Sequence, residues 1–237
     1  ARAIGFDLGV PGKSDLGLVE DVLCDRAFLD DRAERAIELT TLGELADFGL
    51  AAPHMVANVL AASALARACD VSAEDISVAL ASFTVDAHRH QVVASHAGIT
   101  WIDDSKATNP HAANAALNAH ESIVWIVGGL LKGVSIDDLV QKHAQRLRGA
   151  VVIGIDQMDV LRAFERHAPG VPVQRVETTE TSEVMPLAVS FALGLAQSAD
   201  VVLLAPAAAS MDQFTDYAHR GTAFAQAVRA ATGGGLG

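Results

Sequence analysis

The sequence has few cysteines and no long apolar run. Cys24 and Cys69 are the only 2 cysteines among 237 residues, and they stand far apart in no metal-ligand spacing. This pattern favours two reduced, buried thiols in a cytoplasmic protein over a disulfide framework. Hydrophobic residues make up 51% of the chain, yet no stretch approaches the roughly 20 apolar residues that a membrane-spanning helix needs. We therefore predict a cytoplasmic protein without membrane insertion.

Basic residues are also scarce. The chain has 17 Lys and Arg against 29 Asp and Glu, a formal net charge of -12. Nucleic-acid binders need a basic surface that neutralises phosphates, so the charge argues against DNA and RNA as partners. An anionic small molecule remains compatible with it, because a few cations gathered in one cleft can outweigh a distant acidic surface.

A complete phosphate-binding loop and an initiating Met are both missing. Gly12-Lys13-Ser14 resembles the end of a P-loop, but that pattern needs a glycine where Asp7 stands. We expect a turn at Pro11-Gly12 instead, and no ATP positioned for phosphoryl transfer by this chain alone. The N-terminus has no signal-peptide character either, which predicts a cut inside a longer chain.

Hydrophobic patterning predicts two parts with a boundary near residues 84 to 88. Residues 1–84 begin with about 50 residues of short strands and turns rather than a complete core. Helices at 56–69 and 73–82 follow, the second with Ser72 as N-cap. Residues 85–237 begin with a hairpin, 91–95 and 99–102.

Alternating helices and strands make up the rest of the second part. Helices are expected at 110–119, 135–147, 157–167, 182–197 and 211–231, and strands at 122–127, 150–155, 171–176 and 200–205. Short apolar strands separated by helices are typical of a mostly parallel sheet covered on both faces. The fold class is therefore α/β, with a Rossmann-like domain at 85–237.

Polar residues follow three of the expected strands. They are Asp103-Asp104-Ser105-Lys106, the loop Gly128–Gly133 with Lys132, and Ala205-Pro206 leading to Ser210-Met211-Asp212-Gln213. In parallel sheets, ligands gather outside the carboxyl ends of the strands. We therefore predict a binding site at this edge.

Each of these groups also has a structural interpretation. Asn109 before Pro110 fits the N-cap of a helix. The free N–H groups of that helix's first turn could hold an anion. Equally, Thr108 and Asn109 could only cap while Asp104 pairs with Lys106 in solvent.

The remaining polar residues leave similar alternatives. Lys132 could hold a carboxylate or phosphate, or be a solvated surface residue. Ser210 with Gln213 fits a capping box, although the same hydroxyl could meet a ligand. His88-Arg89-His90 has no second ligand pair for a metal, and Arg89 is the better phosphate contact. Asn58, four residues after His54, could meet a purine edge or a backbone carbonyl.

Together these residues resemble the Mur ligase family, and within it the enzymes that add D-glutamate. The resemblance covers nearly the whole chain and rests on motifs in the family's order and approximate spacing. The motifs are His54–Asn58, His88-Arg89, Trp101–Asn109, Gly128-Gly129 with Lys132, and Ala205–Phe214. The string Asp104–Asn109 is the most discriminating, because sister ligases carry different residues there. Three residues depart from common family choices: Met55, where Asn is frequent, Ala208, where Cys is common, and Tyr217, where Phe is common.

The resemblance implies a three-domain ATP-dependent ligase of peptidoglycan synthesis. Residues 1–84 would be the tail of its central ATP-binding domain and 85–237 its amino-acid-binding domain. The P-loop, the Mg²⁺ ligands and a carbamylated lysine would precede Ala1. ATP would convert the carboxylate of UDP-N-acetylmuramoyl-L-alanine into an acyl phosphate, which the amine of D-glutamate attacks. Such chemistry depends mainly on positioning and charge neutralisation.

The resemblance also implies residue roles. The ATP contacts would be Asn58 at adenine, Asp104 at the ribose, Arg89 and Lys106 at the phosphates, and His88. The D-glutamate contacts would be Thr108, Lys132, Ser210, Met211 and Tyr217. We assign no metal ligand and no complete catalytic set here, only Arg89 and Lys106 in support. Because the P-loop is absent, we predict that this polypeptide does not turn over alone. The alternatives are a sister amino-acid ligase and a non-catalytic Rossmann-like binding module.

Overall fold

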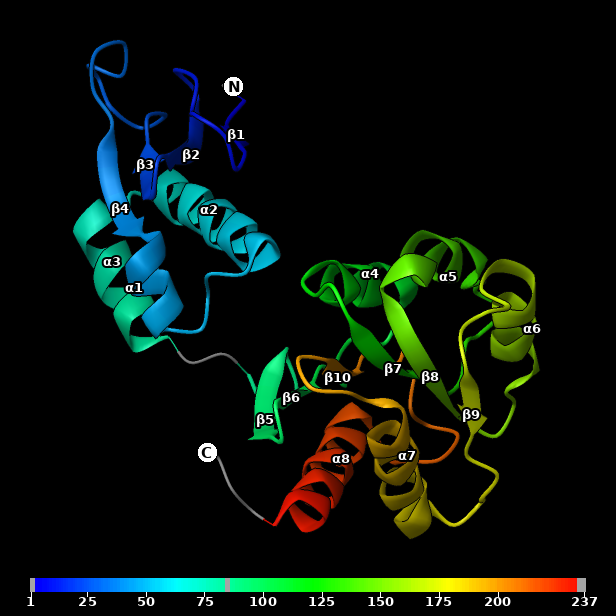
Figure 1. Ribbon diagram of the computed structural model, residues 1–237. Helices are drawn as coiled ribbons and strands as arrows, with labels where there is room; N and C mark the ends of the chain where they lie inside the picture. The colour runs from blue at the N-terminus through cyan, green and yellow to red at the C-terminus, as the bar shows by residue number, and fades with distance from the viewer. Residues whose placement is uncertain (1–2, 84–85, 234–237) are drawn as a thin grey trace. The chain divides into compact units, whose positions relative to one another are not determined.

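A computed structural model describes residues 3–83 and 86–233, and the chain forms two compact units, Ala1–Val85 and Asp86–Gly237 (Figure 1). Residues 84 and 85 of the predicted boundary, the first two residues and the Gly-rich end from 234 lie outside the described part. Each unit is described by itself below. No helix within the described ranges is both long enough and apolar enough to cross a membrane.

Within residues 3–83 the first unit has a small sheet and three helices. Its strands, in the order β1-β2-β3-β4, are β1 (Gly5–Phe6), β2 (Asp15–Val19), β3 (Val22–Asp25) and β4 (Ile37–Thr41). Its helices are α1 (Leu42–Asp47), α2 (Pro53–Ala68) and α3 (Ala73–Ser82). β1 pairs with β2 in parallel, and the other pairs are antiparallel.

The strands of this unit share a core with α2. Leu16 and Leu23 from the strands pack in one cluster with Leu60 from the helix. The predicted strands, and the Ser72 cap of α3, are confirmed. Helix α1 was not predicted, although Thr41 opens it with a capping box. The expectation of two buried thiols is wrong for Cys69, which is exposed.

The second unit is a six-stranded sheet in the order β5-β6-β10-β7-β8-β9. Its strands are β5 (Gln91–His96), β6 (Ile99–Asp103), β7 (Ile123–Gly128), β8 (Leu147–Ile153), β9 (Val173–Arg175) and β10 (Val201–Leu204). Its helices are α4 (Pro110–Asn118), α5 (Asp137–His143), α6 (Met158–His167), α7 (Thr181–Leu195) and α8 (Tyr217–Thr232). Only β5 is antiparallel to its neighbour, so the predicted α/β class with a mostly parallel sheet is confirmed.

Helices cover both faces of this sheet (Figure 1). Helices α4, α5 and α6 pack on one face, and α7 and α8 pack on the other. Alternate residues of β7 enter the two cores: Trp125 joins the first and Ile126 the second. A strand buried on both faces must be apolar throughout, and every residue of β7 is buried.

The strand order reverses the direction of the connections beside β10. The helices after β6 and β7 lie on one face, whereas α8, which follows β10, lies on the other. Loops that leave adjacent parallel strands toward opposite faces open a crevice at the carboxyl edge of the sheet. The polar loops predicted from sequence follow these three strands.

Two predicted helix boundaries are wrong. The helix expected at 135–147 is α5 followed by a short 3₁₀ helix, Ala144–Arg146, and β8 already begins at Leu147. The last helix begins at Tyr217 rather than at residue 211, and Asp216 is its N-cap, accepting from the His219 amide. Residues 211–216 form turns and bends.

Two glycines, Gly128 at the end of β7 and Gly133 in the loop after it, give a test of this region. Gly128 has φ +116°, and a Cβ there would overlap the Ile153 carbonyl oxygen. Gly133 has φ +78°, but a Cβ there would meet open space. We expect Gly128→Ala to lower the free energy of unfolding by about 2–5 kcal/mol, and Gly133→Ala by only about 1 kcal/mol. Chemical denaturation followed by tryptophan fluorescence measures both, because Trp101 and Trp125 are buried in this unit. Equal losses would contradict the structure of this loop.

Candidate functional site

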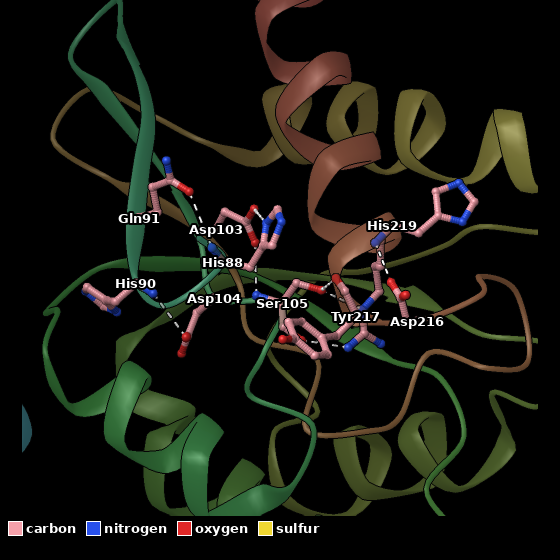
Figure 2. Close-up of polar contacts among 10 residues, drawn as sticks. His88, His90, Gln91, Asp103, Asp104, Ser105, Asp216, Tyr217 and His219 are labelled. Carbon is pink, nitrogen blue, oxygen red and sulfur yellow. Dashed lines mark hydrogen bonds and ion pairs between the residues drawn. The ribbon is translucent and has the colours of Figure 1, made fainter. Parts of the chain in front are cut away.

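The end of β6 is joined to the loop before β5 by an acid–imidazole contact. Asp103 is buried, and its Oδ2 lies 2.6 Å from His88 Nδ1 (Figure 2). Its Oδ1 accepts a hydrogen bond from the Ser105 amide at 2.9 Å. One carboxylate therefore fixes both the returning loop and the first turn after the strand.

Asp104 is a half-buried carboxyl with one oxygen engaged by the backbone. Its Oδ1 accepts from the His90 amide at 3.1 Å (Figure 2). Burial raises the pKa of Asp104 to about 6, and nearby Asp103 adds to this effect. The His90 N–H and the Arg89 guanidinium act in the opposite direction, because both favour the charged form. The carboxylate is thus mostly ionised at neutral pH.

One interpretation of the sequence paired Lys106 with Asp104. In the structure the Lys106 side chain has other partners. Its Nζ lies 3.4 Å from Asp86 Oδ2 and 5.1 Å from the centre of the Tyr217 ring. Arg89 Nε lies 3.4 Å from the same carboxylate oxygen. Asp86 and Arg89 are exposed and Lys106 is half-buried. Ion pairs this open to solvent contribute little to stability, so both cations can change partners at low cost.

The first turn of α8 supports this group of residues. The Tyr217 ring meets His88 edge-on, with ring centres 6.4 Å apart. A Cβ at Gly221, one turn further along, would overlap His88 and Asp103. The missing side chain of Gly221 therefore makes room for the His88–Asp103 contact.

Arg220 is a buried cation that the sequence did not single out. Its relative exposure is 0%. Its Nε donates to Ser105 Oγ at 2.9 Å and its Nη2 to the Ser105 carbonyl at 2.9 Å. Nη1 and Nη2 each lie 3.2 Å from the Ala208 carbonyl. Burial lowers the pKa of Arg220 to about 10, against the opposing effect of Asp212 and Asp103.

These contacts connect the loops after β6 and β10. The Ala207 amide also donates to the Ala107 carbonyl at 2.9 Å, which adds a second link between them. In the sequence Arg220 looks like any basic residue of an amphipathic helix. The one local signal was its neighbour Gly221, because a glycine inside a helix marks a close approach.

The loops after β7 and β10 are joined by a short backbone bridge. Leu130 and Ala209 exchange hydrogen bonds of 2.9 and 3.1 Å. Ser210, buried, and Lys132, exposed at φ +55°, are carried just beyond this bridge. Met211 is 62% exposed. The bridge therefore brings two of the predicted D-glutamate loops together.

The predicted capping box at Ser210 is wrong. No helix starts there, and the Ser210 carbonyl accepts from the amides of Gln213 and Phe214 in a turn. The Gln213 side chain instead accepts from the Gly154 amide at 2.8 Å. By contrast, Asn109 caps α4 as predicted, with its Oδ1 accepting from the Ala112 amide at 3.0 Å.

The two remaining predicted residues lie in different units. Asn58 lies in the first unit, exposed on α2, so the site described here is built from the second unit alone. Thr108 is half-buried in the loop between β6 and α4, where its amide donates to the Lys106 carbonyl at 2.8 Å. Within residues 3–83 and 86–233, no three His, Cys, Asp or Glu side chains are grouped in a way that could hold a metal ion.

The Arg220 links predict a large effect of removing this side chain. We expect Arg220→Met to lower the free energy of unfolding of the second unit by about 2–5 kcal/mol, because buried carbonyls lose their donors. Arg229→Met, exposed on the same helix, should change it by less than about 0.5 kcal/mol. Urea unfolding followed by Trp101 and Trp125 fluorescence measures both. Similar small losses would contradict a tie between the loops.

Comparisons with known families and with curated proteins agree on one family. The family described as "Mur ligase, glutamate ligase domain" matches residues 88–208. The chain is 62% identical over 236 residues to the UDP-N-acetylmuramoylalanine--D-glutamate ligase of Leifsonia xyli subsp. xyli, covering 99% of this chain and 46% of that protein. It is 56% identical over 228 residues to the ligase of the same name from Streptomyces avermitilis, covering 96% and 48%. The chain thus spans about half the length of the curated relatives it matches.

A solved structure shares the fold. The crystal structure of MurF from Acinetobacter baumannii superposes with a TM-score of 0.57 at 19% sequence identity, covering 95% of this chain and 46% of that one. At this identity the likeness concerns the fold. The family match over 88–208 covers just over half of the sequence, and the chain therefore belongs to the Mur ligase family.

Proposed function

We propose that this chain forms the amino-acid-binding part of a cytoplasmic ATP-dependent ligase that adds D-glutamate to UDP-N-acetylmuramoyl-L-alanine in peptidoglycan synthesis. The observation that carries the proposal is the match to ligases named for D-glutamate at 62% and 56% identity over nearly the whole chain. In this proposal residues 1–84 are the C-terminal part of the central ATP-binding domain. Residues 85–237 form the Rossmann-like amino-acid-binding domain.

The nucleotide side of the site would use Asp104, Arg89 and Lys106. The Asp104 carboxylate keeps one oxygen that no hydrogen bond in the described part engages, so it can accept from the ribose hydroxyls. Among the residues that the structure describes, Arg89 and Lys106 have the exposed Asp86 as their shared ion-pair partner, and both can turn to phosphate oxygens. His88 would hold this loop in place.

The D-glutamate side would use residues beyond the Leu130–Ala209 bridge. Lys132 is exposed and would bind a carboxylate of D-glutamate. Ser210 and Thr108 would add hydroxyl groups, and Met211 and Tyr217 would provide the apolar walls. The positive φ of Lys132 supports a role beyond solvation, because a non-glycine residue in this region is strained.

Such a site would act by positioning and charge neutralisation. An acyl phosphate formed with ATP carries negative charge close to the incoming carboxylates of D-glutamate. Lys106, Arg89 and Lys132 would reduce that repulsion and orient the amine for attack. Mg²⁺ would supply further charge neutralisation at the phosphates. The described residues include no cluster suited to a metal, and we assign no Mg²⁺ ligand among them.

The Lys132 contact gives the test of this proposal. We expect Lys132→Ala to weaken D-glutamate binding about ten- to a hundredfold, because a charge-assisted hydrogen bond contributes about 1.5–3 kcal/mol. Calorimetry or an NMR titration of the chain measures the affinity. The matched control is Lys142→Ala, since Lys142 is also exposed and bonds to Asn114; it should leave the affinity unchanged.

The choice of amino acid separates the alternatives. D-glutamate should bind more tightly than L-glutamate or D-alanine. A preference for another amino acid would indicate a sister ligase. If the Lys132→Ala variant and the unchanged protein bind D-glutamate with equal affinity, Lys132 is a solvated surface residue without a role in binding.

A further inference from the structure

Two histidines face each other beside the proposed nucleotide site. His90 Nε2 and His120 Nε2 are 3.0 Å apart, and the ring planes differ by 3°. His90 belongs to the loop before β5, whereas His120 follows α4, 30 residues further along the chain. Both side chains are half-buried. None of the site roles assigned above involves His120.

The contact requires that the pair carry a single proton between the two nitrogens. A neutral imidazole has one N–H donor and one acceptor nitrogen, so one Nε2 must donate and the other accept. If both rings were protonated, both nitrogens would carry hydrogen and the two charges would repel. Burial lowers the pKa of His120, which favours the neutral, bonded state.

His90 links this pair to Asp104 through its backbone. Its main-chain N–H donates to Asp104 Oδ1 at 3.1 Å (Figure 2). The φ of His90 is +51°, in the left-handed region, which costs about 1–2 kcal/mol for a residue with a Cβ. A strained conformation persists only where contacts hold it, and the His120 imidazole provides one such contact.

We propose that His120 is a positioning residue for Asp104, because its hydrogen bond to the His90 ring holds the His90 backbone in the conformation that directs its N–H at the Asp104 carboxylate. The structural claim concerns Asp104 alone. Its consequence for ligand binding rests on the proposed function, in which Asp104 contacts the ribose of a nucleotide.

Charged groups from several elements surround this arrangement. Asp103 and Arg89 lie close enough to Asp104 to shift its pKa in opposite directions. On the other side, Arg146 Nη1 donates to the His120 carbonyl at 2.8 Å, and Glu121 is the next residue in the chain. Any test by pH must therefore follow Asp104 itself rather than the overall stability.

The test is the pKa of Asp104 in a His120→Phe variant, followed by carbon-13 NMR of its carboxyl group. The His90 N–H lowers the pKa of Asp104. Losing this donor should therefore raise the pKa by about one pH unit above the value of the unchanged protein. If His120 only fills space, the pKa of Asp104 in the His120→Phe variant stays unchanged, or it falls because water enters beside the carboxylate. Either of these results would overturn the proposal.

Two variants control for packing. His120→Gln can donate or accept through its amide and should restore the pKa of Asp104 to within a few tenths of a unit. His111→Phe changes an exposed histidine on α4 and should have no effect. Should His120→Phe fail to fold, by the fluorescence of Trp101 and Trp125, His120→Leu takes its place in the same pKa measurement, with the same two outcomes. In the unchanged protein, coupling between the two Nε2 nuclei should be present at pH 8, and its absence would contradict the hydrogen bond on which the proposal rests.

Titration with ADP separates this proposal from the proposed function. We expect the ADP affinity of the chain at pH 7 to fall about two- to tenfold in His120→Phe, because less Asp104 is ionised and its loop is less fixed. If the pKa of Asp104 rises but ADP does not bind the unchanged protein, the nucleotide role fails and the positioning role stands. If the pKa does not rise, the positioning role fails whatever ADP does.

Discussion

The carboxyl edge of the second unit depends on one buried guanidinium. Strands β6 and β10 are neighbours, but the helices that follow them pack on opposite faces of the sheet, which carries their loops apart. Arg220 reaches from α8 between these loops and donates to Ser105 on one side and Ala208 on the other. Burying a cation is costly, and nearby Asp103 and Asp212 favour its charged form. Only a fixed arrangement of both loops gives this charge all its partners.

A fixed backbone allows the site to carry adaptable side chains. Four non-glycine residues with positive φ lie on the loops at or beside this edge: His88, His90, Lys132 and Ala207. Surrounding contacts hold such strained residues, and strain of this kind collects at functional sites. In contrast, Lys106, Arg89 and Lys132 are held by weak exposed contacts or point to solvent. The backbone is thus preorganised while the cations can reorient toward an anionic ligand.

The sequence predicted the elements better than their arrangement. The apolar run of β7 and the cap at Asn109 follow from local patterns, and both are confirmed. The position of β10 between β6 and β7 depends on how whole helices pack, and no local sequence pattern predicts that. The capping-box pattern at Ser210 was misleading because Gln213 bonds to Gly154, more than 50 residues away. Asp216, the actual cap, has His219 rather than Glu at the third helical position.

The site was predicted in the same uneven way. The polar residues after each strand could be found because a parallel sheet brings its carboxyl ends to one edge. The partners that hold them could not, since Arg220 and His120 are distant in sequence from the residues they contact. No periodic sequence pattern marks a basic residue that is buried or two histidines that pair, so these roles can be found only in the structure.

The most direct test of the account is a map of backbone amide NMR shifts as D-glutamate is added to the chain. If the Arg220 tie and the Leu130–Ala209 bridge make one site of three loops, the shifts will gather after β6, β7 and β10 together, at Lys106–Thr108, Gly129–Gly133 and Ala207–Met211. A single site of three loops would be contradicted by shifts confined to one of these loops. Shifts centred on the separate pocket of about 310 Å³ between the ends of β8 and β9, lined by Gln157 and Arg175, would contradict it as well.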